Sequence, residues 1–353
     1  MNTSVPLARR RNTLSSSLGL GEKLFASSDE RRFATAIEKG LAVVEEGLLT
    51  EMSFADNLAD VTSRYLLEAG GKRVRPVLTL LTAQLGDGNT DGVITAAMAI
   101  EITHLASLYH DDVMDDAPMR RGVPSAQAKW GNSVAILTGD LLFGRASKLM
   151  ARLGSHAIDV QADTFERLCL GQLHETIGPE DGQDPVQHYL QVLRDKTGSL
   201  IAAAARVGVQ YSGAPEEYLD PVTEYGEKIG VAFQLIDDVI DLAPKDDNTG
   251  KNAGTDLRAG VSTLPLLYLT EQAATDAASA ALLERIDRAV QADDEAGVQS
   301  AVAELRKHPA TQRTLDEAHA WARSAIAALE SLPRGPVKKA LVKFADAIVE
   351  RSS

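Results

Sequence analysis

From about Asp29 onward, apolar residues recur at spacings of three and four along nearly the whole chain. Ala and Leu are abundant, and runs of alternating β-branched residues are almost absent. This periodicity is typical of helices that bury one face, and it leaves little sequence for a sheet. The pattern therefore predicts an all-α protein. Glycine and proline breaks divide it into about ten or more helices; these breaks fall at 70–71, 86–88, 122–124, 178–179, 212–215, 244 and 333–336.

None of these breaks is long enough to link two domains, and no repeat of fixed period is present. We expect one helical domain over residues 29–353, built around a central apolar cavity, and a flexible N-terminal tail over residues 1–28. The tail is rich in Ser and carries Arg9, Arg10 and Arg11, but it lacks the apolar core of a secretory signal. A weak contact of this basic tail with a membrane surface is the minority interpretation.

Composition excludes several classes of protein. The chain has 36 Lys and Arg against 50 Asp and Glu, a net charge of −14, which disfavours nucleic-acid binding through a basic surface. No run reaches the roughly 18 to 20 continuous apolar residues that span a membrane. The single cysteine, Cys169, rules out an internal disulfide framework and a multi-cysteine zinc site, and predicts a reducing, cytoplasmic setting. Its apolar neighbours predict that Cys169 is buried.

One acidic pattern, D-D-x-x-D, occurs twice, at 111–115 and at 237–241. On a helix, the first and last carboxylates of each copy share a face and repel one another. Both copies follow strongly apolar helical runs, so burial adds a desolvation cost that only a cation relieves. A site made only of oxygen ligands favours Mg²⁺, which binds one or two carboxylates together with substrate phosphates.

We therefore interpret the two clusters as Mg²⁺–diphosphate clamps. The six metal ligands that the pattern predicts are Asp111, Asp112, Asp115, Asp237, Asp238 and Asp241. The alternative is an acidic helix end on a solvated face. That alternative suits a single D-D-x-x-D better than two copies that both follow apolar helices.

Basic residues also occur in short groups. The segment GGKRVRP (70–76) is a glycine-hinged turn before a helix, so backbone N–H groups, a Lys and two Arg converge on a helix N-terminus. Arg120 and Arg121 follow the first acidic cluster, and Lys196 and Lys251 lie further along the chain. Together these cations are sufficient for two diphosphate groups.

With these motifs in this order, the chain resembles the trans-type polyprenyl diphosphate synthases of the isoprenoid synthase superfamily. The resemblance covers about residues 35–350 and rests on GGKRVRP (70–76), His104, HDDVMDDAPMRRG (110–122), GD (139–140), DKTGSL (195–200), FQLIDDVID (233–241) and GKNAGTDLRAGVSTLP (250–265). It implies an enzyme that condenses isopentenyl diphosphate with an allylic diphosphate to give an all-trans polyprenyl diphosphate. It also implies a homodimer. We expect two to three Mg²⁺ ions per active site and a peripheral membrane contact for product release.

The same resemblance assigns roles to individual residues. Those implied to hold the diphosphate of isopentenyl diphosphate are Lys72, Arg75, His104 and Arg121. Those implied to hold Mg²⁺ against the allylic diphosphate are Asp111 and Asp115, with Asp237 opposite. The rest of that diphosphate is neutralised by Arg120, Lys196 and Lys251, and the reacting centre is lined by Thr197 and Gln234.

This chemistry needs no nucleophilic Ser or Cys. Ionising an allylic diphosphate creates a carbocation and an anionic leaving group, so metal ions must stabilise the leaving group and apolar walls must exclude water. His104 lies two helical turns before Asp111 on the same face, which suits a diphosphate ligand better than a general base. Its alternative is a histidine of the core. The resemblance implies that the departing pyrophosphate takes the final proton.

Small residues line the helix face that leads to the first cluster: Ala106, Thr103, Ala99 and Thr95, with Ser107 beside them. The stretch spans about 11 residues, or roughly 16 Å, and predicts a long product, on the order of six to ten isoprene units. Close helix packing is the alternative reason for small residues there. A farnesyl or geranylgeranyl diphosphate synthase is the corresponding alternative function.

Two further functions are weighed. Terpene cyclases and head-to-head condensing enzymes also use acidic Mg²⁺ clusters, but cyclases typically carry Asn/Asp-x-x-Ser/Thr-x-x-x-Glu as the second motif and lack GGKRxRP. Aromatic residues make up only 5% of this chain, few for a cavity that steers cations on π-faces. A non-catalytic subunit is expected to have lost part of an acidic cluster or the Arg pair, and both are retained. The sequence thus favours the elongating synthase.

Overall fold

The computed structural model describes residues 28–243 and 253–352, and within these ranges the chain is almost entirely helical, as predicted. The elements are α2 (Ser28–Glu51), α3 (Asn57–Glu68), α4 (Val74–Ala83), α5 (Asp91–Met114), β1 (Met119–Arg120), β2 (Val123–Pro124), α6 (Ala126–Trp130), α7 (Asn132–Leu153), α8 (Ser155–Ile177), α9 (Pro185–Leu193), η1 (Arg194–Gly198), α10 (Ser199–Tyr211), η2 (Glu216–Tyr218), α11 (Leu219–Asp241), α12 (Thr255–Arg258), α13 (Leu264–Ala273), α14 (Ala277–Gln291), α15 (Glu295–Leu305), α16 (Pro309–Ala328), η3 (Leu329–Ser331), α17 (Pro336–Val349) and η4 (Glu350–Ser352). The breaks at 70–71, 86–88, 178–179 and 212–215 lie between elements, the break at 122–124 falls in the β1–β2 hairpin, and the break at 333–336 leads into α17; Pro244 lies outside the described residues.

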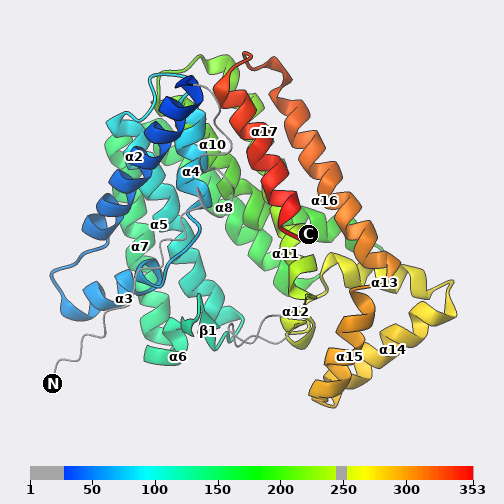
Figure 1. Cartoon of the computed structure of the whole chain (residues 1–353). Coiled ribbons are helices and arrows are strands. Elements are labelled where there is room, and N and C mark those ends of the chain that lie inside the picture. Colours follow the sequence, from blue (N-terminus) through cyan, green and yellow to red (C-terminus); the bar gives the residue numbers. More distant parts are fainter. Residues whose placement is uncertain (1–27, 244–252, 353) are drawn as a thin grey trace.

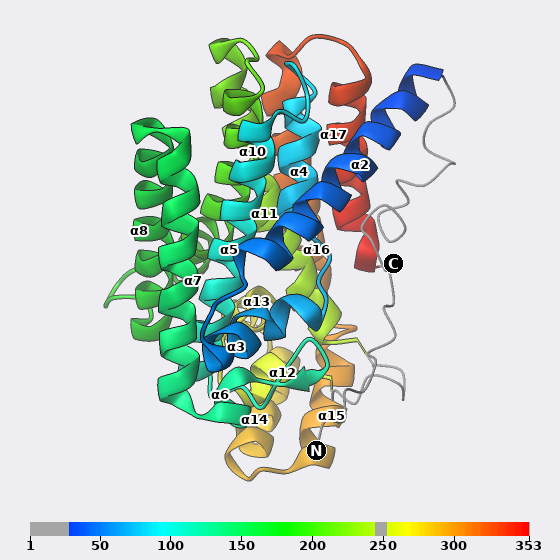
Figure 2. The ribbon, with the colours of Figure 1, turned by 90° about the vertical axis from the view of Figure 1, so that its left-hand side faces the viewer.

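Helices α5, α10 and α11 lie in the middle of the bundle (Figure 1). Helix α5 packs on α7, α10 lies between α4 and α11, and α16 covers the far side of α11. Seen from the side, α2 crosses the bundle diagonally and α7 and α8 run side by side at one edge (Figure 2). This layering buries an apolar stripe of each helix against at least one neighbour.

Helix α5 is apolar around its whole circumference, and Thr90 caps its start by accepting a hydrogen bond from the Val93 N–H (3.2 Å). Among the described helices it alone is long and apolar enough to be a candidate membrane span, and 72% of that apolar window is buried inside the fold. An apolar helix covered by neighbours is typical of a core element. Its last turn carries the first acidic cluster.

Helix α11 ends in the second acidic cluster, and the two helices end at the same end of the bundle. The β1–β2 hairpin follows α5 there and α12 follows α11, both at the lower end in Figure 1. Tertiary packing thus gathers two motifs that are more than a hundred residues apart in sequence. The connection between α11 and α12 includes residues outside the described ranges, among them the predicted ligand Lys251.

One prediction about burial is wrong. Cys169 on α8 is exposed. Helix α8 turns an apolar face outward, with Phe165, Leu170 and Leu173 also exposed, so apolar sequence neighbours do not indicate burial here. Helix α2 begins at Ser28, and residues 1–27 lie outside the described part of the chain, so the predicted tail stays a prediction.

Candidate active site

The first acidic cluster occupies the C-terminal end of α5. Asp111 lies in the last turn and Asp115 caps the helix, its N–H donating to the Asp111 carbonyl oxygen (2.8 Å). Burial, with repulsion from Asp115, raises the pKa of the Asp111 carboxyl to about 6, although Lys196 opposes the shift. Asp115 is exposed. The cluster therefore holds negative charge at a position that favours a cation.

Asp112, the middle residue of this cluster, is fully buried (0% exposed) and held from the hairpin. The Arg120 Nε lies 2.6 Å from Asp112 Oδ1, whereas Asp112 Oδ2 is buried without a hydrogen-bond partner. Burial raises the pKa of the Asp112 carboxyl, and Arg120 opposes that rise. Asp112 and Arg120, predicted as metal ligand and diphosphate ligand, are therefore also partners of each other; both assignments stay predictions.

The carboxylates fit a metal that completes its coordination from the substrate. In the described parts of the chain, no three carboxylate, imidazole or thiol groups come close enough to hold an ion by themselves. Mg²⁺ typically binds through one or two carboxylates plus water and phosphate oxygens. The raised pKa of Asp111 and the unpartnered oxygen of Asp112 are what such a donor set shows before a cation binds. The residues present therefore suit Mg²⁺ together with a diphosphate.

The second acidic cluster is held by partners from three other elements. Asp237 Oδ1 lies 2.5 Å from a guanidinium nitrogen of Arg351, and Asp238, which is buried, accepts a hydrogen bond from the Tyr189 hydroxyl (2.7 Å). Asp241 accepts the Asp256 N–H at 3.1 Å. Burial raises the pKa of Asp237, although Arg351 and then Lys72 oppose the rise. The solvated helix end considered above describes Asp115 but not the buried Asp112 and Asp238.

Arg351, near the C-terminus, is a site residue that the sequence did not reveal. Its guanidinium lies over the Phe233 ring, 4.5 Å from the centroid, and the Lys72 ammonium lies 5.9 Å from the same ring. Both cations therefore face the second acidic cluster. A single Arg in an amphipathic C-terminal segment carries no motif, so no sequence signal marked it.

A turn of π-helix, η1, brings Lys196 and Thr197 to the site. The Lys196 ammonium pairs with Glu175 of α8 (2.5 Å), and the Thr197 hydroxyl contacts Gln234 Oε1 of α11 (3.4 Å). Burial raises the pKa of Tyr189, whose hydroxyl binds Asp238 of the second cluster, and nearby carboxylates including Glu175 add to the rise. Glu175 therefore adds negative charge beside Lys196. It was missed because nothing in the sequence separates it from other helical glutamates.

A second, more basic group lies beside the clusters, between α4 and α5. Its members are Arg75 of α4, His104 of α5 and Arg121 of the hairpin. The buried Glu101 partly offsets the effect of burial on the pKa values of Arg75 and Arg121. Burial, then Arg75 and Arg121, lowers the pKa of His104 well below its usual value, so the imidazole is neutral at pH 7. The Arg75 Nε is buried without a hydrogen-bond partner. This excess of buried donors suits a polyanion.

Arg73, part of the predicted anion-binding turn, has a different role. It occupies the left-handed region (φ 52°, ψ 37°) at the start of α4 and pairs with Glu45 and, at 3.3 Å, with Glu101. Its nitrogens also donate to the Gly70 and Leu67 carbonyl oxygens, both at 3.2 Å. Arg73 therefore holds the turn together, while Arg75, two residues on, stays available.

The hairpin separates the adjacent residues Arg120 and Arg121. The strands are joined by a two-residue turn in which Arg121 (φ 53°) and Gly122 (φ 78°) both have positive φ, the pattern of a type I′ turn. Arg120 consequently reaches Asp112, whereas Arg121 donates to the Leu66 carbonyl oxygen at 2.7 Å and to that of Gly70. One hairpin thus supplies a cation to each half of the site.

The small residues predicted to set product length are all on α5. Ala99, Thr103, Ala106 and Ser107 are buried, and Thr95 is half-buried. Gly139 of α7 approaches so closely that a Cβ there would lie 3.2 Å from the Ala106 carbonyl oxygen. Close packing of α5 on α7 is therefore one reason for small side chains here, and the effect on product length stays a prediction.

The comparisons with known proteins agree with this geometry. A model of the polyprenyl synthetase family matches residues 56–305. Nonaprenyl diphosphate synthase of Mycobacterium tuberculosis is 44% identical over 321 residues, which cover 90% of this chain and 94% of that protein. The chain therefore belongs to the polyprenyl synthetase family, and it is a prenyltransferase that elongates prenyl diphosphates.

Solved structures give the same fold. A polyprenyl synthase from Caulobacter crescentus, complexed with calcium and isoprenyl diphosphate, matches with a TM-score of 0.82 and 32% identity, covering 92% of this chain and 98% of that one. Geranylgeranyl pyrophosphate synthase from Corynebacterium glutamicum, also complexed with calcium and isoprenyl diphosphate, matches with a TM-score of 0.78 and 39% identity, covering 93% and 98%. A divalent metal and an isoprenyl diphosphate therefore occur together in both relatives.

Proposed function

We propose that the chain condenses isopentenyl diphosphate with an allylic diphosphate and repeats the step to make a long all-trans polyprenyl diphosphate. The observation that carries this proposal is the pair of sites at one end of the bundle. One is acidic and is formed at the ends of α5 and α11, and the other is a buried group of cations. A site for each of two diphosphates is what a condensation between them requires.

The acidic half takes the allylic diphosphate through Mg²⁺, with two to three ions per site. When bound, the metal stabilises the negative charge that develops on the leaving diphosphate. Asp111, Asp115 and Asp237 hold it, while Lys196 and Arg120 add positive charge on the substrate side. Thr197 and Gln234 border the reacting carbons, and the apolar core behind α5 excludes water. Lys251 belongs to the same proposed group and lies outside the described residues.

The basic half takes isopentenyl diphosphate. Arg75, His104 and Arg121 donate to its diphosphate, and Lys72 approaches from the start of α4. A neutral His104 donates one N–H without adding to the repulsion among the guanidinium groups. The diphosphate relieves that repulsion, so binding is favoured by charges that are already in place.

Product length is tested by one substitution on α5. In an assay with isopentenyl diphosphate, an allylic primer and Mg²⁺, we expect the unaltered chain to give products on the order of six to ten isoprene units, consistent with a ~16 Å face of small residues. Ala106→Phe places a ring in that path, and we expect the product to shorten to a few units. Chromatography of the dephosphorylated products measures it.

The control for this experiment is Ala157→Phe on α8, which adds the same ring to a buried alanine away from α5. A loss of yield without a change of length is expected there. Unchanged product length in Ala106→Phe, with normal turnover, would show that the small residues serve only helix packing. In that case the shorter-chain alternative is tested by the length of the unaltered chain's own product.

We further propose a homodimer that buries the outer face of α7 and α8. Exposed apolar residues gather on these two adjacent helices, in helical spacing: Ile136, Leu137, Leu141, Leu170, Leu173 and Ile177. Exposed apolar stripes of this kind mark interfaces. Light scattering of the unaltered chain is expected to give twice the chain mass of 37.7 kDa. The double variant Leu137→Glu, Leu173→Glu is expected to give the mass of a single chain. A monomeric unaltered chain would contradict the interface.

We also propose a cytoplasmic location and a peripheral membrane contact for product release.

A further inference from the structure

The turn that carries Lys196 and Thr197 has an unusual backbone. Between α9 and α10, residues Arg194–Gly198 form a π-helix, in which the Ser199 N–H donates to the Arg194 carbonyl oxygen. A π-helical turn inserts one extra residue and so rotates the side chains it carries relative to the flanking α-helices. Such turns need tertiary support, because they are less stable than α-helix. The support visible here comes from α8 and α11.

Both neighbouring helices approach the π-turn at glycines. A Cβ at Gly171 of α8 would lie 2.6 Å from the Lys196 backbone nitrogen, and one at Gly230 of α11 would lie 2.7 Å from the Gly198 Cα. No side chain fits at either position without movement of the backbone. The π-turn is therefore held between the two helices with no room to shift.

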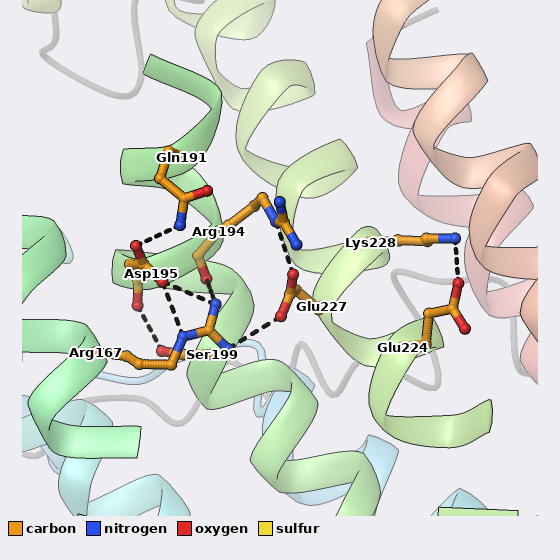
Figure 3. Close-up of polar contacts among 8 residues, drawn as sticks. All are labelled: Arg167, Gln191, Arg194, Asp195, Ser199, Glu224, Glu227 and Lys228. Carbon is orange, nitrogen blue, oxygen red and sulfur yellow. Dashed lines mark hydrogen bonds and ion pairs between the residues drawn. The ribbon is translucent and has the colours of Figure 1, made fainter. Parts of the chain in front are cut away.

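A set of ion pairs fixes the turn from the same two helices (Figure 3). The Arg167 guanidinium of α8 binds Asp195 Oδ1 (2.8 Å), Glu227 Oε2 of α11 (3.0 Å) and the Arg194 carbonyl oxygen (3.4 Å). Arg194 Nε in turn binds Glu227 Oε1 (2.7 Å), and Gln191 donates to Asp195 Oδ2 (2.7 Å). One planar guanidinium thus joins α8, the π-turn and α11.

The residues of α8 that contact the turn are spaced four apart. Arg167 binds the start of the turn, Gly171 admits the Lys196 backbone, and Glu175 pairs with the Lys196 ammonium at 2.5 Å. Residues at i, i+4 and i+8 share one helix face. A single face of α8 therefore contacts the backbone of the π-turn, limits its rotation, and supplies the carboxylate that pairs with the Lys196 ammonium.

We propose that Arg167 and Glu227 are positioning residues that act through Lys196, by fixing the π-turn so that the ammonium reaches the allylic diphosphate. The inference rests on the proposed role of Lys196 in binding that substrate. Arg167 and Glu227 themselves touch neither acidic cluster. Their effect is confined to the allylic half of the site, because the basic half is built on α4, α5 and the hairpin.

A matched pair of substitutions on α11 tests this role. Glu227→Gln removes the carboxylate that Arg167 and Arg194 share, whereas Glu224→Gln removes an exposed carboxylate paired only with Lys228 in the same stretch of helix (Figure 3). For Glu227→Gln and Arg167→Gln we expect a ~10- to 100-fold loss in kcat/KM for farnesyl diphosphate, the cost of a small misplacement. The KM for isopentenyl diphosphate stays within twofold. Glu224→Gln changes neither, and Arg167→Lys retains an intermediate activity.

A double-variant cycle separates positioning from general destabilisation. If Arg167 acts through Lys196, then Arg167→Gln with Lys196→Met binds farnesyl diphosphate and Mg²⁺ no more weakly than Lys196→Met alone. Effects that multiply, or a parallel rise in the KM for isopentenyl diphosphate, would overturn the positioning role. An unchanged affinity in Lys196→Met itself would instead overturn the assignment of Lys196 to the allylic substrate, and the positioning role with it.

Discussion

Replacing Asp111 with Asn is expected to reduce turnover by about 10³-fold or more, since leaving-group stabilisation by a bound metal contributes several kcal/mol. The substitution keeps the shape of the side chain and removes one charge from the cluster that we propose holds Mg²⁺. Steady-state kinetics at saturating substrates measures the loss. Asp116→Asn is the matched control, because Asp116 is an exposed neighbour in the same acidic run and has positive φ, which Asn tolerates.

We expect the metal-free protein to remain folded after this substitution. Asp111→Asn removes a half-buried charge that Asp115 repels, so the melting temperature measured by circular dichroism in the presence of a chelator stays the same or rises. A chelator added to the unaltered chain should likewise abolish allylic diphosphate binding and leave the helical signal intact. Turnover close to that of the unaltered chain in Asp111→Asn would remove the first cluster from the mechanism.

The pH dependence follows from the same carboxyl. Burial raises the pKa of Asp111 from 3.8 to about 6, so a proton competes with the metal below about pH 6. Metal affinity, measured by calorimetry, is expected to fall up to ~10-fold per pH unit below that value for one displaced proton. The free energy of unfolding depends on pH with the opposite sign. Since the folded state holds this proton more tightly than the unfolded chain, the free energy of unfolding of the metal-free protein decreases as pH rises from about 4 to 6.

Arg75→Met is expected to raise the KM for isopentenyl diphosphate by about 30- to 300-fold, the usual cost of removing a buried charged donor from a bound anion. Arg75 is suited to this test because its Nε has no hydrogen-bond partner in the described structure. Removing it leaves no protein acceptor unpaired. Initial rates with varied isopentenyl diphosphate measure the effect, and the affinity for the allylic diphosphate is expected to remain within twofold.

Arg73→Met provides the contrast, two residues away. Arg73 pairs with Glu45 and with the buried Glu101, so its loss leaves a buried carboxylate less well compensated and is expected to lower the melting temperature. Arg75→Met is expected to change the melting temperature less than Arg73→Met does, because it removes attraction to Glu101 and repulsion from Arg121 together and breaks no ion pair or side-chain hydrogen bond found in the described residues. The opposite pattern, a destabilised Arg75→Met with normal KM, would make Arg75 a structural residue.

Much of the site could be predicted from the sequence, because its motifs combine residue types with fixed local spacing. The two D-D-x-x-D clusters, the GGKRVRP turn and the order of the remaining motifs are readable without a structure, and the helical class follows from the spacing of apolar residues. The partners of these residues were not readable. Arg120 and Arg121 are adjacent in sequence, yet a two-residue turn directs them to different halves of the site.

The residues that were missed share a physical cause. Glu175, Arg351 and Arg167 contact the site, or the turn that carries Lys196, from elements far along the chain, and each is an ordinary charged residue in its own helix. The wrong prediction for Cys169 has the same origin. An apolar run predicts that a helix face is apolar, but it does not say whether other helices of the same chain cover that face. Only the packing of α8 and η4 decides these cases.

By itself, the sequence determined the all-α class and the family, and it supplied the carboxylates and cations from which we propose that two diphosphate sites are built. These follow from local periodicity and from spacing within single turns of helix, which chain geometry fixes over short distances. The tertiary structure alone decided which acidic and basic side chains pair with one another. It also decided that a π-turn between α8 and α11 carries Lys196 and that Arg351 forms an ion pair with Asp237. Pairing across helices depends on how the helices pack, and no local pattern encodes it.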